Sequence, residues 1–409
     1  MKKALVLAGG FPQIALIEEL KRQGYTVVLA DYFSEPVAKK YADIFYQEST
    51  LDVEAITEIA KKEKVDFLIT ACTDQALLTV AKVSEDLGLP CYIDYQTALN
   101  VTNKSYMKKV FNENNVSTAR HVVMGSLDIS KISHMNYPLI VKPVDCNSSK
   151  GVKKVINEDE LKVAFADAVK LSRTDTAIVE EFVEGVELSV DVYVEDGKAH
   201  VLSVCKLDKI GDNDKFVIFR GWYPALEAEA VMGHIQQTAQ QIADAFGLKN
   251  TPMLIQMISD GNRVYVLEFS ARTGGGVKYI LIKKASGFDV IKAVVDLTRG
   301  EKPHIDENKP ESKYMVNSFI YCKPGFFDHL EGFEEMKQEG IMADYYLFKW
   351  KGAEFDTVEN SGDRIAGFTV QGDSLEELAM KHDKIEKTIK VIGSNGEDIM
   401  RHDLLTPLR

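Results

Sequence analysis

A carboxylate, a hydroxyl and a guanidinium alternate along residues 268–272, and three glycines follow at 274–276. Because alternate residues of an extended strand point to the same side, Glu268, Ser270 and Arg272 would share one face. Carboxylate and hydroxyl oxygens are hard ligands that suit Mg²⁺, which also binds phosphate oxygens. The guanidinium could neutralise charge on a transferring phosphoryl group, and glycines let backbone N–H groups approach an anion closely. The pattern therefore predicts phosphoryl-transfer chemistry.

The strand before this segment offers another oxygen ligand, the side-chain amide of Gln256. Residues 253–259 and 263–270 are predicted as two strands that flank Asp260-Gly261, a dipeptide typical of hairpin turns. A loop of three or five residues would pair Gln256 directly with Glu268, whereas a two-residue loop would not. Such a pair would present an amide oxygen and a carboxylate oxygen to one metal ion.

A lysine stands near the end of the apolar run 139–143, and a small polar loop follows it. Lysine is almost never buried without a partner, so we expect Lys142 to meet an anion. Residues 144–151 (Val-Asp-Cys-Asn-Ser-Ser-Lys-Gly) offer backbone N–H groups and hydroxyls that could surround phosphate oxygens. Ordinary surface loops have this composition about as often as phosphate-binding loops do, so the loop alone does not decide the function.

Glu187 lies on the polar face of the next predicted strand, 187–194, which alternates polar and apolar residues. If Asp196-Gly197 forms a two-residue turn, Glu187 is directly opposite Lys206. Two interpretations stay open at this point. The pair could be a surface ion pair worth less than ~1 kcal/mol, or both side chains could face a cleft together with Lys142.

The elements that would position these residues begin with alternating strands and helices in the first hundred residues. Apolar runs and amphipathic spacing predict strands at 4–8, 26–30 and 66–70 and helices at 13–23, 53–62 and 75–87. This βαβα order is typical of a parallel, doubly wound sheet. Gly9, Gly10 and Asp31 match part of a dinucleotide fingerprint whose third glycine is missing. We interpret them as a tight strand-to-helix turn that could hold a small anion.

The rest of the sequence predicts a mixed α and β arrangement. Beyond two short helices within 97–115, strands are expected at 139–143, 152–156, 177–183, 187–194, 200–206, 253–259 and 263–270, with helices at 159–171 and 226–247. From about residue 305, strands near 315–321 and 365–371 and a helix at 374–390 predict an α+β tail.

Composition restricts the class of protein. The 409 residues are 45% hydrophobic and carry a formal charge of −13, as expected for a globular protein of two or three domains. An acidic chain without basic runs is not expected to bind nucleic acid or anionic lipid. No apolar run approaches the roughly 18–20 residues needed to cross a bilayer. Five scattered cysteines without a CxxC pair predict neither a disulfide framework nor a zinc site, and indicate a cytoplasmic protein.

Taken in order, Lys142, Glu187 and the Glu268-to-Gly276 segment resemble the ATP-grasp superfamily, in its carbamoyl-phosphate synthase large chain-like or carboxylate–amine ligase branch. The tail at 364–377 (Arg-Ile-Ala-Gly-Phe-Thr followed by Gly-Asp-Ser-Leu-Glu-Glu) resembles carboxylase and amino-acid ligase members. The resemblance implies an α/β and α+β fold in three parts. These are a Rossmann-like preATP-grasp domain at 1–96, an ATP-grasp domain at 97–304 with a small lysine-bearing subdomain at about 112–183, and a C-terminal α+β lobe at 305–409.

The resemblance also assigns roles. Residues implied to bind ATP are Lys104 and Lys142 on the phosphates, Ser148, Ser149 and Gly151 in the lid, Glu180, Glu181, Phe182 and Val183 in the adenine hinge, Glu187 on the ribose and Leu267 under the adenine. Those implied to bind metal are Gln256, Glu268 and Ser270, the last standing where members usually have Asn. Those implied to act in catalysis are Arg272, Lys142 and Lys206.

The implied reaction uses ATP and Mg²⁺, with Mn²⁺ as an alternative ion, to convert a carboxylate to an acyl phosphate that an amine then attacks. The partners are a small-molecule carboxylate and amine, and the resemblance is compatible with a homodimer. Candidates for the acceptor pocket are Arg220, Trp222, Tyr223 and Lys278. Alternative interpretations are a bicarbonate-activating enzyme of the carboxylase or carbamoyl-phosphate synthase type, a non-catalytic ATP-binding regulatory homologue, and a NAD-dependent oxidoreductase.

Overall fold

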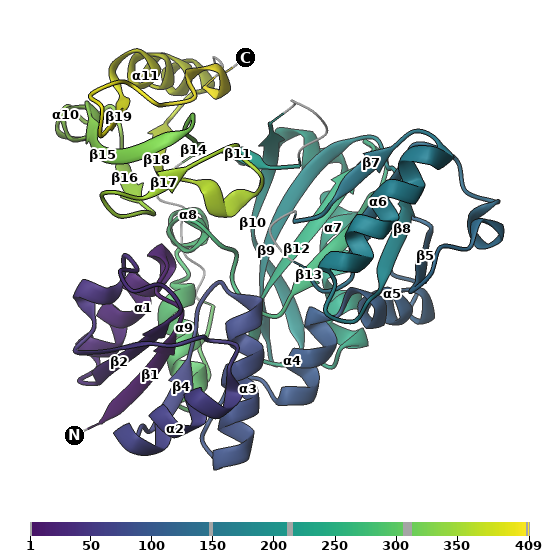
Figure 1. Ribbon diagram of the computed structural model, residues 1–409, viewed down its shortest axis with the longest axis horizontal. Coiled ribbons are helices and arrows are strands. Elements are labelled where there is room, and N and C mark those ends of the chain that lie inside the picture. The colour runs from purple at the N-terminus through teal and green to yellow at the C-terminus, as the bar shows by residue number, and fades with distance from the viewer. Residues whose placement is uncertain (1, 147–149, 211–215, 306–312, 406–407, 409) are drawn as a thin grey trace.

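The computed structural model describes residues 2–146, 150–210, 216–305, 313–405 and 408. Its N-terminal part is a parallel sheet in the order β3-β2-β1-β4. The predicted strands form β1 (Lys3–Leu7), β2 (Thr26–Asp31) and β4 (Phe67–Ile69), whereas β3 (Ile44–Gln47) has no counterpart in the predictions. Helices α1 (Phe11–Arg22), α2 (Val53–Glu63) and α3 (Asp74–Leu87) cover the two faces, which confirms the doubly wound arrangement (Figure 1).

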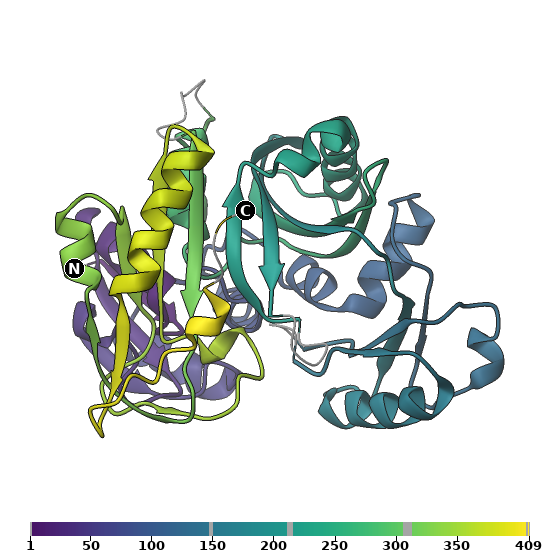
Figure 2. The same ribbon diagram turned by 90° about the horizontal axis from the view of Figure 1, so that it is seen from above.

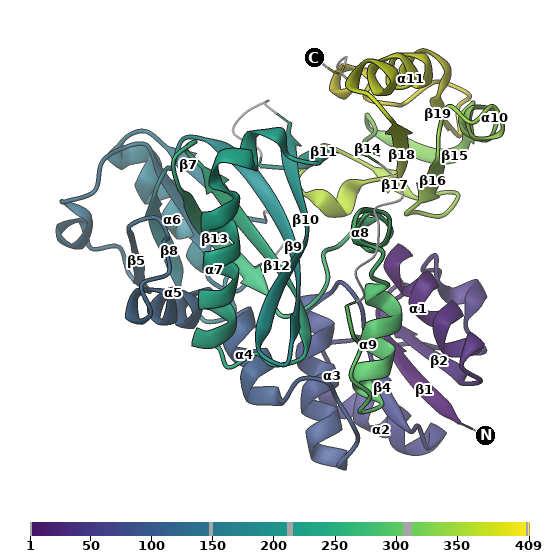
Figure 3. The ribbon, with the colours of Figure 1, turned by 180° about the vertical axis from the view of Figure 1, so that it is seen from behind.

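A helix from much later in the chain completes one face of this sheet. Helix α9 (Val290–Thr298) follows α8 (Lys278–Ser286) and packs against α1. Its residues Ile291, Val294 and Val295 belong to the same apolar cluster as the strand residues Ala4 and Val6. The chain therefore returns to the N-terminal sheet after it has formed the central sheet, as Figure 3 shows from behind.

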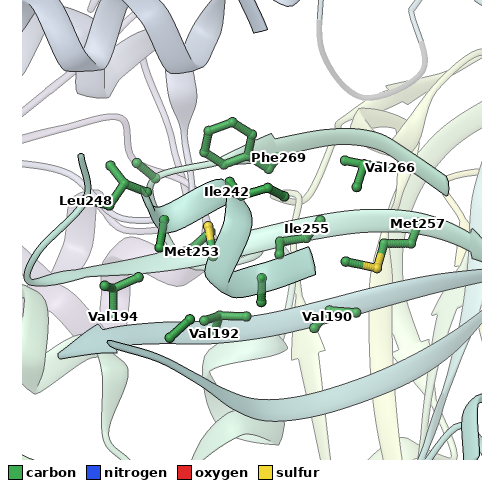
Figure 4. Close-up of a cluster of buried hydrophobic side chains, with 14 of the residues drawn as sticks. Val190, Val192, Val194, Ile242, Leu248, Met253, Ile255, Met257, Val266 and Phe269 are labelled. Carbon is green, nitrogen blue, oxygen red and sulfur yellow. The ribbon is translucent and has the colours of Figure 1, made fainter. Parts of the chain in front are cut away.

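The central element is an antiparallel sheet in the order β13-β12-β9-β10-β11-β14-β18-β16. Its strands are β9 (Val186–Glu195), β10 (Lys198–Lys209), β11 (Ile218–Tyr223), β12 (Thr251–Ser259), β13 (Val264–Ser270), β14 (Tyr314–Ile320), β16 (Asp344–Leu347) and β18 (Ala366–Gly372). Helix α7 (Met232–Ala245) covers one face, where its residue Ile242 packs on Val192 and Ile255 of the sheet (Figure 4). The single helix predicted at 226–247 is a 3₁₀ turn (Leu226–Val231) followed by α7.

A second, smaller antiparallel sheet has the order β5-β8-β6-β7 and lies on the side of the central sheet that is away from the N-terminal part (Figure 2). Its elements are β5 (His121–Met124), β6 (Leu139–Pro143), β7 (Lys153–Val155), β8 (Ala177–Glu181) and helix α6 (Glu158–Leu171). Helices α4 (Tyr95–Thr102) and α5 (Lys104–Glu113) lead into it from the N-terminal part. Figure 2 shows this small unit set apart from the N-terminal and C-terminal parts, with the central strands between them.

The C-terminal part adds β14, β16 and β18 to the central sheet and a three-stranded sheet of β17 (Glu354–Phe355), β15 (Gly325–Glu331) and β19 (Lys390–Gly393). Helices α10 (Phe333–Gln338) and α11 (Leu375–Thr388) share its apolar core. Short 3₁₀ turns occur at Lys39–Tyr41, Ile129–Ile132, Ser361–Asp363 and His402–Leu404. None of the helices within the described ranges is long and apolar enough to cross a membrane.

Candidate active site

The hairpin of β12 and β13 places the predicted oxygen ligands side by side. Gln256 is paired with Glu268, as predicted, but the loop at 260–263 has an even length. A register shift beyond the pair, with Leu267 as the extra residue, restores the pairing that an odd loop would have given. The pair is therefore confirmed, while the loop lengths from which it was expected are wrong.

Two cavities meet at this pair, and Lys104, Gln256 and Glu268 line both of them. The smaller one, here called the lysine-rich cavity, has a volume of about 110 Å³ and lies between the small sheet and the central sheet. The predicted residues that line it are Lys104, Lys142, Glu180, Glu181, Phe182, Val183, Glu187, Gln256, Leu267 and Glu268. The other, here called the central cavity, has a volume of about 220 Å³ and includes Ser270, Arg272 and Lys278.

Lys142 is buried on β6 and meets an anion, as the sequence predicts. Its Nζ lies 2.5 Å from Oε2 of Glu180, and the other oxygen of that carboxylate lies 2.7 Å from Nζ of Lys108 on α5. Burial disfavours the ionised Glu180, but the charges of Lys108 and Lys142 outweigh it and hold its pKa at about 2. Burial also opposes the charge on Lys142, and Glu180 overcomes it and raises the pKa of Lys142. Glu180 and Lys142 are therefore both charged at neutral pH.

Lys104, at the start of α5, joins the Gln256–Glu268 pair to the loop that follows β6. Its Nζ lies 3.0 Å from Oε2 of Glu268 and donates to the carbonyl oxygen of Cys146 at 2.7 Å. Ser148 and Ser149, predicted for the lid, lie outside the described residues. Gly151 has a φ of +75°, and a Cβ there would come within 2.8 Å of a methyl group of Leu171, so only glycine fits this position.

The segment predicted as a hinge leaves the strand directly after Glu181. The backbone N–H of Phe182 donates to the carbonyl of Pro138 at 3.1 Å, and the Lys154 ammonium lies 4.1 Å from the centre of the Phe182 ring. The Glu181 carboxylate accepts from the backbone N–H of Asn136 at 3.1 Å. The hinge is thereby attached to the small sheet, while its residues face the lysine-rich cavity.

In the central cavity, Arg272 is held by a residue that the sequence analysis missed. Its Nε donates to Oδ1 of Asp74 at 2.8 Å, and its Nη2 contacts the other oxygen of that carboxylate. Burial opposes ionisation of Asp74, but Arg272 dominates and lowers its pKa, and the Ser270 hydroxyl contributes a further hydrogen bond. Asp74 begins α3 just after β4, at the carboxyl edge of the parallel sheet where ligands of such folds bind. That position was the available signal.

Lys278 also lines the central cavity, as predicted for the acceptor pocket. Its Nζ lies 2.8 Å from Oδ2 of Asp191, which accepts from the Ser203 hydroxyl at 2.6 Å. Burial works against the Lys278 ammonium, but Asp191 overcomes it and raises the pKa. A Cβ on Gly274 would lie 2.9 Å from Cγ of Lys278, so the glycine leaves the room that this lysine occupies.

Lys206 is not in the cleft, and the predicted pairing with Glu187 is wrong. A register shift near Leu202 inserts one residue into β10, so Lys206 is opposite Leu188 instead. Its Nζ lies 2.7 Å from Glu227, and it lines neither cavity. Glu187 does face the lysine-rich cavity, where Lys209 is its partner. The base or cation role expected for Lys206 therefore has no support in its position.

The other acceptor candidates also point elsewhere. Arg220 is buried near Asp208 and Glu386, at 3.9 and 3.8 Å, and Trp222 donates to Asp208 at 2.6 Å. Tyr223 contacts the carbonyl of Ala285 and packs in a separate apolar cluster.

Arg364 lines the central cavity and was missed by the sequence analysis. Its guanidinium donates to three neutral oxygens: the Tyr321 hydroxyl at 3.0 Å, the carbonyl of Ile218 at the start of β11 at 3.0 Å and the Ser361 hydroxyl at 3.2 Å.

A third cavity, here called the outer cavity, lies at the carboxyl edge of the N-terminal sheet, where Gly9 and Asp31 lie. The Asp31 carboxylate accepts from the backbone N–H groups of Gly9 at 2.5 Å and Phe33 at 2.7 Å, and a Cβ on Gly9 would lie 2.6 Å from Cβ of Pro36. The glycine therefore leaves room for a proline of the same chain. The outer cavity adjoins the central one, because Arg364 and Gly275 line both.

Known proteins resemble this chain in sequence and in fold. Residues 135–280 match a family model described as an ATP-grasp domain. Over 285 residues the chain is 27% identical to the formate-dependent phosphoribosylglycinamide formyltransferase of Sulfurisphaera tokodaii. This alignment covers 66% of this chain and 70% of that protein. Over 314 residues the chain is 23% identical to the carbamoyl phosphate synthase large chain of Clostridium acetobutylicum. This alignment covers 74% of this chain but only 29% of that protein.

The fold as a whole has solved counterparts. The crystal structure of an L-amino acid ligase from Bacillus licheniformis matches with a TM-score of 0.80 and 21% identity, over 97% of this chain and 99% of that one. At this level of identity the likeness shows the fold. The predicted fold class, a Rossmann-like sheet followed by a two-part ATP-grasp body and a C-terminal α+β part, is confirmed.

Proposed function

The chain carries an ATP-grasp domain, and we propose that it is an ATP- and Mg²⁺-dependent ligase that joins a small-molecule carboxylate to an amine. In the first step a carboxylate oxygen attacks the γ-phosphorus of ATP, ADP leaves, and an acyl phosphate forms. In the second step the amine nitrogen attacks the acyl carbon, inorganic phosphate leaves with the electron pair of the C–O bond, and the nitrogen loses a proton. No covalent enzyme intermediate is needed.

The observation that carries this proposal is the meeting of two cavities at Lys104, Gln256 and Glu268. A phosphoryl transfer needs a donor and an acceptor on opposite sides of the transferred group, held in line. Among the described residues, the lysine-rich cavity and the central cavity share these three lining residues and no others, so a donor in one and an acceptor in the other would meet there. The γ-phosphate would then lie beside the Gln256–Glu268 pair.

The residues of the lysine-rich cavity fit a nucleoside triphosphate. Lys104, Lys142, Lys150 and Lys209 supply positive charge, and the hinge supplies backbone groups beside an apolar floor that includes Leu267. Gln256 and Glu268 offer the oxygen ligands that Mg²⁺ prefers, and Mn²⁺ accepts the same kind of ligand. Bound there, the ion would neutralise charge that develops on the phosphates.

The central cavity fits a carboxylate acceptor. Arg272 is neutralised by Asp74, and Lys278 by Asp191, so both are oriented before any substrate arrives. Arg364 instead donates to neutral oxygens and keeps its positive charge for an incoming anion. Because Arg364 also lines the outer cavity, we place the entrance for the acceptor there; within the part of the chain that the structure describes, this cavity shares no lining residue with the lysine-rich one.

The test is release of ADP and phosphate from Mg-ATP with pools of carboxylates and amines. We expect release only when both a carboxylate and an amine are present, and its loss in Lys142→Ala and Glu268→Ala. Lys162→Ala, on the exposed side of α6, is the matched control and should behave as the wild type. Release with bicarbonate alone would replace this proposal by the carboxylase-type alternative. ATP binding without release from any pool would favour the non-catalytic alternative.

Two finer points belong to the same proposal. Replacing Mg²⁺ by Mn²⁺ in this assay should retain turnover, because the ligand set consists of oxygens. The homodimer stays a prediction, and sedimentation velocity of the purified chain would decide it.

A further inference from the structure

A second lysine of α5, one turn after Lys104, is completely buried. The side chain of Lys108 is 1% exposed, and its helix neighbours Met107 and Phe111 belong to the central apolar core. Its ammonium has three partners from three different segments. It lies 2.7 Å from Oε1 of Glu180, and it donates to the hydroxyl of Thr118 at 2.5 Å and to the carbonyl of Val266 at 3.3 Å.

Burying this charge is unfavourable, so the charge should have a task that an apolar side chain cannot perform. Burial lowers the pKa of Lys108, and Glu180 opposes that effect. Well-packed apolar residues often replace buried ion pairs without loss of stability. A methionine would fill the space of Lys108, but it would leave Oε1 of Glu180 without a cation.

Glu180 is shared between Lys108 and Lys142, one lysine to each carboxylate oxygen. This division fixes the plane of the carboxylate from both sides. Without Lys108, both oxygens could turn toward Lys142 and draw its ammonium away from the cavity. With Lys108 in place, Lys142 contacts a single oxygen at the edge of the cavity and can also contact a phosphate.

The other contacts of Lys108 reach the metal-binding hairpin. The Val266 carbonyl also accepts from the Thr118 hydroxyl at 2.7 Å, and it directly precedes the extra residue Leu267. That extra residue is what brings Glu268 opposite Gln256. Lys108 therefore touches the strand just before the bulge and the strand that leads to the hinge.

We propose that Lys108 is a positioning residue that holds Glu180 and the bulge at Leu267 in place, so that Lys142 is directed at the phosphates of ATP. It does not touch the nucleotide itself. The inference rests on the proposed function, because it presumes that the lysine-rich cavity binds ATP.

The experiment compares Lys108→Met with Lys108→Arg and the wild type in direct titrations with Mg-ATP, and with adenosine by competition. For Lys108→Met we expect about a tenfold weaker affinity for ATP with less than a twofold change for adenosine. Lys108→Arg should restore the ATP affinity to within about threefold. A merely structural role would weaken both ligands together, or neither, and would lower the melting temperature instead.

The outcomes separate this inference from the function on which it rests. If the wild type does not bind ATP, the proposed function fails. If the wild type binds ATP and Lys108→Met binds it equally well, the positioning role is wrong while the ligase proposal stands. Should Lys108→Met fail to fold, Lys108→Gln, which keeps a hydrogen-bond donor without the charge, is judged by the same ratio of ATP to adenosine affinity.

Discussion

Arg272 donates to both carboxylate oxygens of Asp74, a residue 198 positions earlier in the chain. The contact links the end of the β12–β13 hairpin of the central sheet to the carboxyl edge of the N-terminal sheet. It also fixes the plane of the guanidinium at the wall of the central cavity. We therefore propose that the N-terminal part contributes to the site, since it orients Arg272, the side chain predicted to neutralise charge on the transferred phosphoryl group.

Removing the charge of Asp74 should impair turnover more than nucleotide binding. In Asp74→Asn, Arg272 keeps its charge but loses its bidentate partner, so we expect kcat to fall by about 10²-fold. The affinity for Mg-ATP should change by less than about threefold, because Asp74 does not line the lysine-rich cavity. Steady-state kinetics and titration measure the two effects, with Asp86→Asn on the exposed end of α3 as the control. A large loss of ATP affinity with normal kcat would contradict the assignment.

Glu180 should make stability depend on pH in the acid range. Burial disfavours its carboxylate, but Lys108 and Lys142 outweigh burial and hold its pKa at about 2, below the ordinary 4.5. A depressed folded-state pKa stabilises the protein above about pH 4.5, and this contribution is lost as the pH falls toward 2. Glu180→Gln leaves two buried ammonium groups unpaired and should cost about 3–5 kcal/mol at neutral pH.

Urea unfolding of wild type and Glu180→Gln between pH 7 and pH 4 tests this. The difference in unfolding free energy between the two proteins should be constant above about pH 5.5. It should shrink by about 1 kcal/mol as the pH is lowered to 4, because only the wild type loses stability there through this group. A difference that stays the same over the whole range would show that Glu180 is not ionised against its lysines in the folded protein.

The parts of the site that the sequence predicted correctly are those set by local periodicity. Alternation placed Glu268 and Ser270 on one strand and Arg272 two residues past its end, and all three line the central cavity. An apolar run with one lysine placed Lys142 on another strand. The parts that failed depend on bulges, each of which adds one residue and changes the pairing beyond it. A bulge near Leu202 moved Lys206 away from Glu187, whereas the one at Leu267 happened to restore the expected pair.

Partners that come from distant segments could not be predicted from spacing. Asp74, Asp191 and Arg364 meet the site only through the packing of the N-terminal sheet, the central sheet and the C-terminal part. Lys108 did leave a local signal, because it interrupts the apolar side of α5 between Met107 and Phe111. A charged residue in that place indicates a buried ion pair, but its partner, Glu180, follows only from the fold.

The position of Lys206 gives a sharp contrast between two lysines. Lys206 contacts Glu227 outside both cavities, so Lys206→Ala should retain activity within about twofold. Lys142→Ala should reduce kcat/KM by about 10²–10³-fold, because a charged contact to the transferred group is lost. Both rates come from one ADP-release assay. Comparable losses in the two variants would mean that Lys206 reaches the substrate after all.

Two neighbouring glycines make a matched pair for the acceptor side. A Cβ at Gly274 would lie 2.9 Å from Cγ and 3.1 Å from Cβ of Lys278, whereas one at Gly275 would meet only the carbonyl oxygen of Cys72, at 3.9 Å. Gly274→Ala should therefore displace Lys278 from Asp191 and cost about 1–3 kcal/mol of stability. Gly275→Ala should stay within about 0.5 kcal/mol of the wild type.

The same pair tests the assignment of the two cavities. Lys278 lines the central cavity and not the lysine-rich one, so Gly274→Ala should raise KM for the carboxylate by about tenfold while the affinity for Mg-ATP stays within about twofold. Thermal unfolding, steady-state kinetics and nucleotide titration of both variants supply the measurements. If Gly274→Ala weakened ATP binding as much as carboxylate binding, the assignment of the two substrates to separate cavities would be wrong, because Lys278 lines only the central one.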